Sequence, residues 1–178
     1  MRRLAVLLAT VCVTTLLPVS TAGADSPVAG RPTGAEPWEP YIQQEFTAAA
    51  GRFCSFPLQL KVLEQDIRKR VLERYPDGSI KREEYAGPLV VAYVNGDTGA
   101  SVERDTGGRG FPQYRTDGTF LRYTSVGPVG FGIREGDDFP KGYYVVDGIH
   151  VMEFAADGRR SFSVRRGPEE NVCEALGD

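Results

Sequence analysis

The chain has 178 residues, of which 41% are hydrophobic and 25% charged, and its formal net charge is −3. This length fits one domain with a single hydrophobic core. The acidic balance argues against nucleic acid and anionic lipid as partners, because both attract basic surfaces.

Residues 1–24 have the layout of a secretory signal peptide. Arg2 and Arg3 precede an apolar stretch over residues 4–17, and Ala22-Gly23-Ala24 forms a small-residue cleavage site. We expect cleavage after Ala24, which would leave 154 residues and shift the formal charge from −3 to −5. The alternative is an N-terminal membrane anchor, which the short apolar run before Pro18 disfavours. The sequence therefore predicts a secreted protein with no transmembrane segment after signal removal.

The mature chain begins with a segment that differs in composition from the rest. Residues 25–37 are rich in Pro, Gly, Ala and Ser and predict a flexible tether. Residues 38–178 then form the single predicted domain. Its first element is an amphipathic helix between Trp38 and Phe53, because apolar residues recur there at spacings of three and four.

From residue 54 onward the spacing of turn-forming residues is typical of β-hairpins. Four Asp-Gly pairs and one Asn-Gly pair separate β-prone runs, and such pairs supply the positive φ of tight turns. Residues 63–75 fit a helix or a strand, and we favour a strand because residues 76–79 then form a hairpin turn. The other predicted strands cover residues 56–62, 80–85, 89–94, 100–105, 113–115, 119–125, 129–133, 143–146, 149–154 and 161–165.

These elements predict a mainly all-β fold with one short N-terminal helix. The strands are expected to form an antiparallel meander, closed as a barrel or folded as a sandwich. Residues 89–94 are apolar on both faces and predict a central strand, covered by the helix at residues 40–50. The Asp-Gly turns give a rhythm of hairpins, but we expect no clean internal repeat.

The cysteines bear on compartment and stability. Cys12 would leave with the signal peptide, whereas Cys54 and Cys173 lie near opposite ends of the remaining chain. In an oxidising compartment they are expected to form a disulfide, worth about 4–5 kcal/mol for a loop of about 120 residues. The alternative is a pair of buried free thiols.

Four short motifs resemble a group of uncharacterised secreted proteins of high-GC Gram-positive bacteria. Those proteins share a Cys-x-Phe-Pro start, a central Asp-Thr-Gly-x-Ser and a Cys-Ala-Ala-Leu-like end. The resemblance implies a two-cysteine β-rich domain and brings no known activity. The motifs lie at residues 54–57, 97–102, 117–119 and 172–176.

His150 is the lone histidine and therefore the first candidate for chemistry. On its predicted strand it shares a face with Met152 and Phe154, which favours an interior side chain over a catalyst. If the strands enclose a cavity, these three residues are the predicted lining of a site for a small apolar ligand.

The acidic residues offer a second, weaker site. Glu135, Asp137 and Asp138 could hold a metal or supply the carboxylate pair of a glycoside hydrolase, although their spacing is not that of an EF-hand. Asp97 lies in an Asp-Thr-Gly sequence like that of aspartic proteases, here after a hairpin turn. No cofactor motif is present, and no Gly-x-Ser-x-Gly elbow accompanies His150.

The sequence thus favours a non-enzymatic binding domain acting outside the cell or at the cell envelope, with an unknown partner such as an envelope component. One alternative is a carrier with a small ligand inside the β structure. The other is a carboxylate-based hydrolase that uses Asp97, Asp137 or Asp138.

Overall fold

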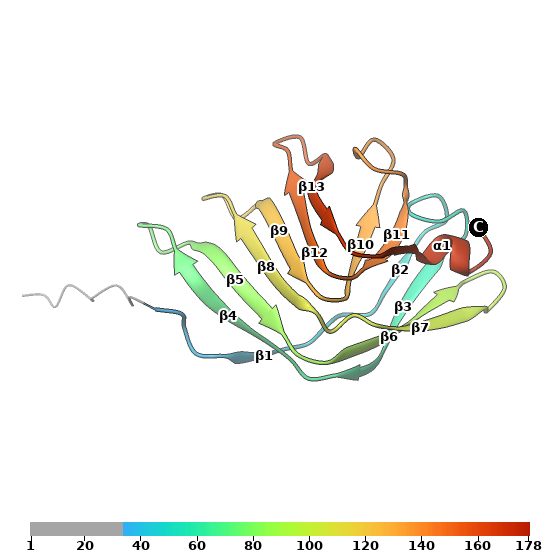
Figure 1. Ribbon diagram of the computed structural model, residues 1–178, viewed down its shortest axis with the longest axis horizontal. Coiled ribbons are helices and arrows are strands. Elements are labelled where there is room, and N and C mark those ends of the chain that lie inside the picture. Colours follow the sequence, from blue (N-terminus) through green and yellow to red (C-terminus); the bar gives the residue numbers. More distant parts are fainter. Residues whose placement is uncertain (1–33) are drawn as a thin grey trace, which may run out of the picture. The chain divides into compact units, whose positions relative to one another are not determined.

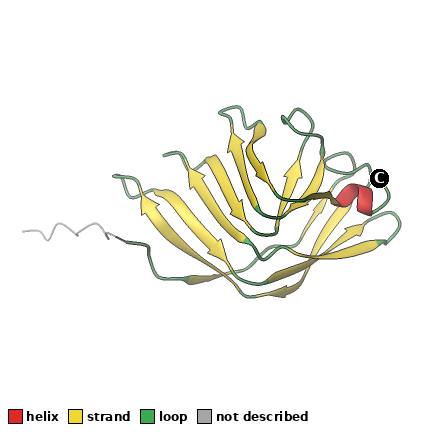
Figure 2. Cartoon of the chain, viewed as in Figure 1, coloured by secondary structure: helices red, strands yellow, loops and turns green. Residues whose placement is uncertain are grey.

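The computed structural model describes residues 34–178, in which nearly all of the regular secondary structure is antiparallel strand (Figures 1 and 2). The predicted signal peptide and the predicted tether up to residue 33 lie outside the described residues. The prediction of a mainly β fold with antiparallel sheets is confirmed. The elements are β1 (Glu39–Tyr41), β2 (Phe46–Ala48), β3 (Leu58–Gln65), β4 (Ile67–Arg74), β5 (Ile80–Ala86), β6 (Leu89–Asn95), β7 (Ser101–Asp105), β8 (Arg109–Tyr114), β9 (Phe120–Val126), β10 (Val129–Ile133), β11 (Gly142–Val146), β12 (Ile149–Phe154), β13 (Arg160–Arg166), β14 (Glu169–Asn171) and α1 (Val172–Ala175).

The strands form three sheets. A seven-stranded sheet has the order β1-β4-β5-β8-β9-β12-β13, a four-stranded sheet the order β2-β3-β6-β7, and a three-stranded sheet the order β10-β11-β14. Each order has two edge strands, so within residues 34–178 the sheets are open and the barrel alternative is not seen. The strand expected over residues 63–75 is present as the end of β3 and as β4, and the hairpin turn at residues 76–79 joins β4 to β5.

Most strands of the seven-stranded sheet continue directly into one of the smaller sheets. The chain passes between β4, β5 and β8 and the four-stranded sheet, and between β9, β12 and β13 and the three-stranded sheet (Figure 1). The six short connections form a line that we call the crease. At the crease, the chain therefore passes from the one large sheet into two separate smaller sheets. The crease lies at residues 66, 87–88, 106–108, 127–128, 147–148 and 167–168.

The chain repeats itself every 40 residues, contrary to our expectation. Asp-Gly turns at residues 77–78, 117–118 and 157–158 join the hairpins of the seven-stranded sheet, and Gly-Pro pairs follow at residues 87–88, 127–128 and 167–168. In each turn the aspartate carboxylate accepts the backbone N–H two residues on, at 2.9 Å in all three cases. Each 40-residue unit therefore contains the same Asp-Gly hairpin turn, followed by the same Gly-Pro connection to a smaller sheet.

Glycine is required where neighbouring strands meet at the crease. A Cβ on Gly87 would lie 2.2 Å from the Asp66 carbonyl oxygen, and one on Gly167 would lie 1.9 Å from that of Asp147. Both glycines also have positive φ, 133° and 132°. Hydrogen bonds such as Asp147 N to Pro168 O, at 2.9 Å, then join the two chain segments. The Gly-Pro pairs thus permit the close approach that turns each strand from one sheet into the next.

Two apolar clusters hold the sheets together. The first joins β3, β6 and β11 with α1, and Tyr93 and Val145 belong to it. The second lies around β10, β11 and β12 and contains Phe131 and Met152. β6 is a central strand, as expected for residues 89–94, but part of its cover comes from β11.

The predicted helix over residues 38–53 is wrong. This stretch forms the edge strands β1 and β2 with a connection between them and a turn after β2. β1 pairs with β4 through Pro40, whose missing N–H suits an edge, and β2 pairs with β3. The three-and-four spacing does not mark a buried helical face, because Ile42 is 61% exposed.

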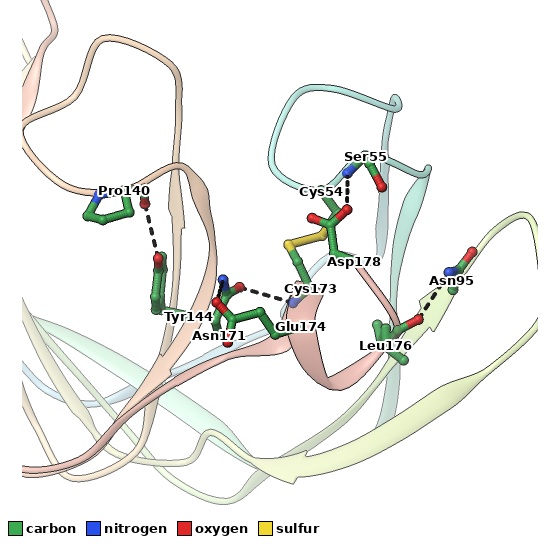
Figure 3. Close-up of a disulfide and its surroundings, with 10 residues drawn as sticks. All are labelled: Cys54, Ser55, Asn95, Pro140, Tyr144, Asn171, Cys173, Glu174, Leu176 and Asp178. Carbon is green, nitrogen blue, oxygen red and sulfur yellow. Dashed lines mark hydrogen bonds between the residues drawn. A yellow bond between two sulfur atoms is a disulfide. The ribbon is translucent and has the colours of Figure 1, made fainter.

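The Cys54–Cys173 disulfide joins the loop before β3 to α1 (Figure 3), and the predicted pairing is confirmed. The Cα atoms are 5.2 Å apart across a sequence separation of 119 residues, and both cysteines are buried. Asp178 accepts a hydrogen bond from the Ser55 backbone N–H at 3.1 Å, and Asn95 donates to the Leu176 carbonyl at 3.2 Å. The end of the chain is thus fixed to the four-stranded sheet.

Candidate functional site

A cavity of about 160 Å³ lies beside the crease, where the seven-stranded sheet divides. Its walls come from all three sheets, and glycines of the crease and of the adjoining strands form part of the lining. Five tyrosines converge on it from separate strands: Tyr41, Tyr85, Tyr93, Tyr123 and Tyr143. We call this space the tyrosine cavity.

The tyrosines pack in pairs, one of which joins two sheets and one of which lies within the seven-stranded sheet. The rings of Tyr93 on β6 and Tyr143 on β11 have centroids 5.1 Å apart, so they join the four-stranded and three-stranded sheets. Tyr41 on β1 meets Tyr85 on β5 edge to face at 5.0 Å. Such pairs fix the ring orientations beyond what burial alone does.

Glycines make room for the hydroxyl groups. A Cβ on Gly130 would lie 2.8 Å from the Tyr93 hydroxyl and 3.0 Å from the Tyr143 hydroxyl. A Cβ on Gly110 would lie 2.0 Å from the Tyr123 hydroxyl. Three of the five hydroxyls therefore lie directly over glycine backbone, where any side chain would displace them.

The tyrosine cavity is polar but uncharged. Its remaining polar side chains are those of Gln43 and Thr106, and its lining contains no ionisable group other than the tyrosines. Burial raises the pKa of Tyr143 to about 12 and that of Tyr123 to about 12. The Tyr123 and Tyr143 hydroxyls thus stay protonated near neutral pH, where each can donate and accept hydrogen bonds.

Tyr85 connects the cavity to a buried carboxylate. Its hydroxyl donates to Glu83 at 3.1 Å, Tyr114 donates to the same carboxylate oxygen at 2.7 Å, and the Lys69 ammonium lies 3.5 Å from the other oxygen. Burial raises the pKa of Tyr85, and the neighbouring Glu83 charge raises it further. Glu83 thereby holds Tyr85 in place. Sequence reasoning missed this residue, although two glutamates inside a predicted strand are unusual.

The three residues predicted to line a ligand site lie elsewhere. His150 is fully buried with its Nε2 3.1 Å from Glu169, and Met152 belongs to the second apolar cluster. Phe154 stacks on Phe120 at 5.1 Å near the hairpin turns. None of the three lines the tyrosine cavity. The Nδ1 atom of His150 has no hydrogen-bond partner among the described residues.

Of the three candidate acidic residues, Asp137 has a buried side chain held by the fold, whereas the side chains of Glu135 and Asp138 are exposed. Asp137 accepts backbone N–H groups of Arg134 at 2.8 Å and Arg160 at 2.9 Å. Asp138 lies 3.5 Å from Arg159, and Glu135 lies 3.9 Å from Lys141.

No group of three or more His, Cys, Asp or Glu side chains within residues 34–178 is placed to hold a metal ion. Asp97 is exposed in the turn between β6 and β7, where its N–H donates to the Asn95 side chain at 3.0 Å.

Glu84 points to the opposite face of the seven-stranded sheet and is only 1% exposed. The Arg70 guanidinium donates to it at 2.8 Å, and Arg109 binds its other oxygen. Burial would raise the pKa of Glu84, but the hydrogen bonds and charges of Arg109 and Arg70 outweigh burial and lower it below the ordinary 4.5.

A lowered carboxyl pKa makes this cluster a source of acid sensitivity. Its stabilisation is present above pH 4.5 and is lost as pH falls through the lowered folded-state pKa. We expect Glu84→Gln to cost about 2–3 kcal/mol at pH 7, less than a fully buried pair because Arg109 is half-exposed. Urea unfolding at pH 7 and pH 3 tests this, since the difference in stability between variant and parent should be smaller at pH 3. An equal difference at both pH values would contradict it.

No family model, no curated protein and no solved structure matches the chain. Among the residues that the structure describes, no helix has the length and apolar character needed to cross a membrane.

Proposed function

We propose that this protein is a non-catalytic, exported binding domain that holds a small neutral molecule in the tyrosine cavity. The observation that carries the proposal is the convergence of five tyrosines from three sheets on one uncharged space. A concave site with a few convergent polar groups is the usual form of a small-molecule site. Export is inferred from the signal-like sequence of residues 1–24 together with the disulfide.

The lining favours a compact polyhydroxylated ligand. Aromatic faces suit the C–H groups of such a compound, while the tyrosine, Gln43 and Thr106 side chains suit its hydroxyls. A charged ligand would meet no counter-charge in the lining and would lose its hydration. The volume of about 160 Å³ corresponds to about five water molecules at ~30 Å³ each, which limits the ligand to a sugar ring or a smaller polyol.

The hydrolase alternative has less support. Asp137 already accepts two backbone hydrogen bonds, and Asp97 lies in an exposed turn. Neither carboxylate lines the tyrosine cavity. The carrier alternative is kept in modified form, because the space lies beside the crease and its lining is tyrosine rather than His150, Met152 and Phe154.

Filling the cavity from its glycine wall tests the proposal. The methyl group of Gly130→Ala would point at the hydroxyls of Tyr93 and Tyr143, so we expect binding of glycerol, glucose or myo-inositol to weaken at least tenfold. Calorimetric titration of each compound measures this. Tyr143→Phe, which removes one hydroxyl and keeps the ring, should weaken binding without closing the cavity.

Gly34→Ala is the matched control, because a Cβ at Gly34 meets nothing within 4 Å. It should bind as the parent does. Thermal unfolding of each variant separates a loss of ligand binding from a loss of fold. Parent protein that binds none of the three compounds, or a Gly130→Ala variant that binds as tightly as the parent, would refute the proposal.

A further inference from the structure

A second hollow has a volume of about 560 Å³. Tyr143 lines both this hollow and the tyrosine cavity. The walls of this hollow, which we call the arginine groove, come from β2, the turn after it, β10 and the start of β13. Its volume falls within the ~300–1,000 Å³ of ordinary ligand sites.

The floor of the arginine groove is apolar. Ala48, Phe53 and Tyr143 are buried core residues, and Phe46 packs on Tyr143 with ring centroids 6.0 Å apart. Phe53 lies against Gly132 of β10, where a Cβ would come within 2.5 Å of the ring. The apolar body of a ligand would therefore rest on fixed aromatic and methyl surfaces.

The rim of the groove carries an excess of positive charge. Arg52 and Arg160 line it, and Arg134 lies next to Arg160. Asp137 is the nearby counter-charge, 3.7 Å from Arg160 and 3.9 Å from Arg134. Burial lowers the pKa of Arg160, and the charges of Arg134 and Arg52 lower it further against the opposing effect of Asp137.

Arg52 is the cation that is free to meet a ligand. Its guanidinium stacks over the Phe53 ring at 5.4 Å and is exposed. No ion pair of Arg52 occurs within residues 34–178, whereas Arg160 also donates to the Gly132 carbonyl. One guanidinium is therefore fixed by the fold, and one is available at the rim.

We propose that the arginine groove binds a carboxylate attached to an apolar body. The apolar part would lie on Phe46, Phe53 and Tyr143, and the carboxylate would accept hydrogen bonds from Arg52 beside Arg160. This chemistry has two natural sources, a free aliphatic acid and the C-terminus of an extended peptide. β2 is an edge strand that lines the groove, so a peptide could also pair with its backbone.

The test compares matched probes with and without the charge. Decanoate and decanol represent the free acid and its neutral counterpart. An acetylated valine tripeptide with a free C-terminus and the same tripeptide amide represent the peptide. We expect saturable binding of a carboxylate probe, read from the methyl NMR shifts of Ala48 and Ala49 and from calorimetry, and no saturation with the neutral counterpart. The tighter of the two carboxylates identifies the source.

Arg52→Gln should weaken carboxylate binding at least tenfold, and added salt should reduce the difference between variant and parent. Arg82→Gln is the control, because Arg82 is an exposed arginine on β5 and does not line the groove. Its affinity should stay within twofold of the parent.

Three results would overturn the proposal: no saturation by either carboxylate, equal binding of decanol and decanoate, or an Arg52→Gln variant that binds like the parent. Titration of the same Arg52→Gln protein with glucose or myo-inositol reports on the tyrosine cavity separately. Failure at one site is therefore distinguishable from failure at the other.

Discussion

Replacing Cys54 and Cys173 together by alanine is expected to destabilise the domain by about 4–5 kcal/mol. The bridge closes a loop across 119 residues, and its removal releases that constraint from the unfolded chain. Alanine avoids placing new polar atoms at two positions that are 1% exposed. Urea unfolding of the double variant and the parent, both under oxidising conditions, measures the difference.

Parent protein unfolded in the presence of a reductant is the control, since it loses the bond and keeps the sulfur atoms. It should resemble the double alanine variant to within about 1–2 kcal/mol, the remainder arising from the cavity that two truncated side chains leave. A reduced parent as stable as the oxidised protein would show that the bridge does not stabilise the fold.

Gly167→Ala is expected to cost about 3–4 kcal/mol, because two penalties coincide at the crease. The residue has φ of 132°, and its Cβ would lie 1.9 Å from the Asp147 carbonyl oxygen. Relief requires separating the backbone segments that the Asp147 N–H to Pro168 carbonyl bond joins at 2.9 Å. Thermal and urea unfolding measure the loss.

Gly158→Ala separates the two penalties. Gly158 has φ of 81° in a hairpin turn, and a Cβ there meets nothing within 4 Å. This variant carries conformational strain alone and should lose about 1–2 kcal/mol. If the two variants were equally stable, close backbone approach at the crease would not contribute to the requirement for glycine.

The sequence predicted correctly the features that depend on only a few residues. Asp77-Gly78 and Asp117-Gly118 indicate hairpin turns because glycine supplies positive φ within the turn itself. Cys54 and Cys173 indicate a bridge because they are the two cysteines left once the predicted signal peptide, which contains Cys12, is set aside. Trp38, Ile42 and Phe46 misled us, because only Phe46 packs on the core, from edge strand β2 onto Tyr143. Trp38 and Ile42 flank β1 and are exposed.

The candidate site depends on distant parts of the chain and could not be predicted in this way. Tyr93 and Tyr143 lie in predicted strands and Tyr41 in the predicted helix, and nothing in these local patterns shows that three sheets meet around them. The 40-residue spacing, by contrast, was visible in the Asp-Gly and Gly-Pro pairs. The Gly-Pro pairs mark three of the six connections of the crease, the feature that brings the tyrosines together.

The 40-residue period also bears on how this domain could arise and diversify in evolution. Each 40-residue unit has its own Asp-Gly turn and its own Gly-Pro pair. Duplication of one unit would therefore add strands to the seven-stranded sheet and to a smaller sheet at once, and would preserve the alignment of the crease. Loss or gain of a single strand would instead interrupt the alternation of the chain between the seven-stranded sheet and the smaller sheets. Growth by whole-unit duplication is therefore the route that this architecture tolerates.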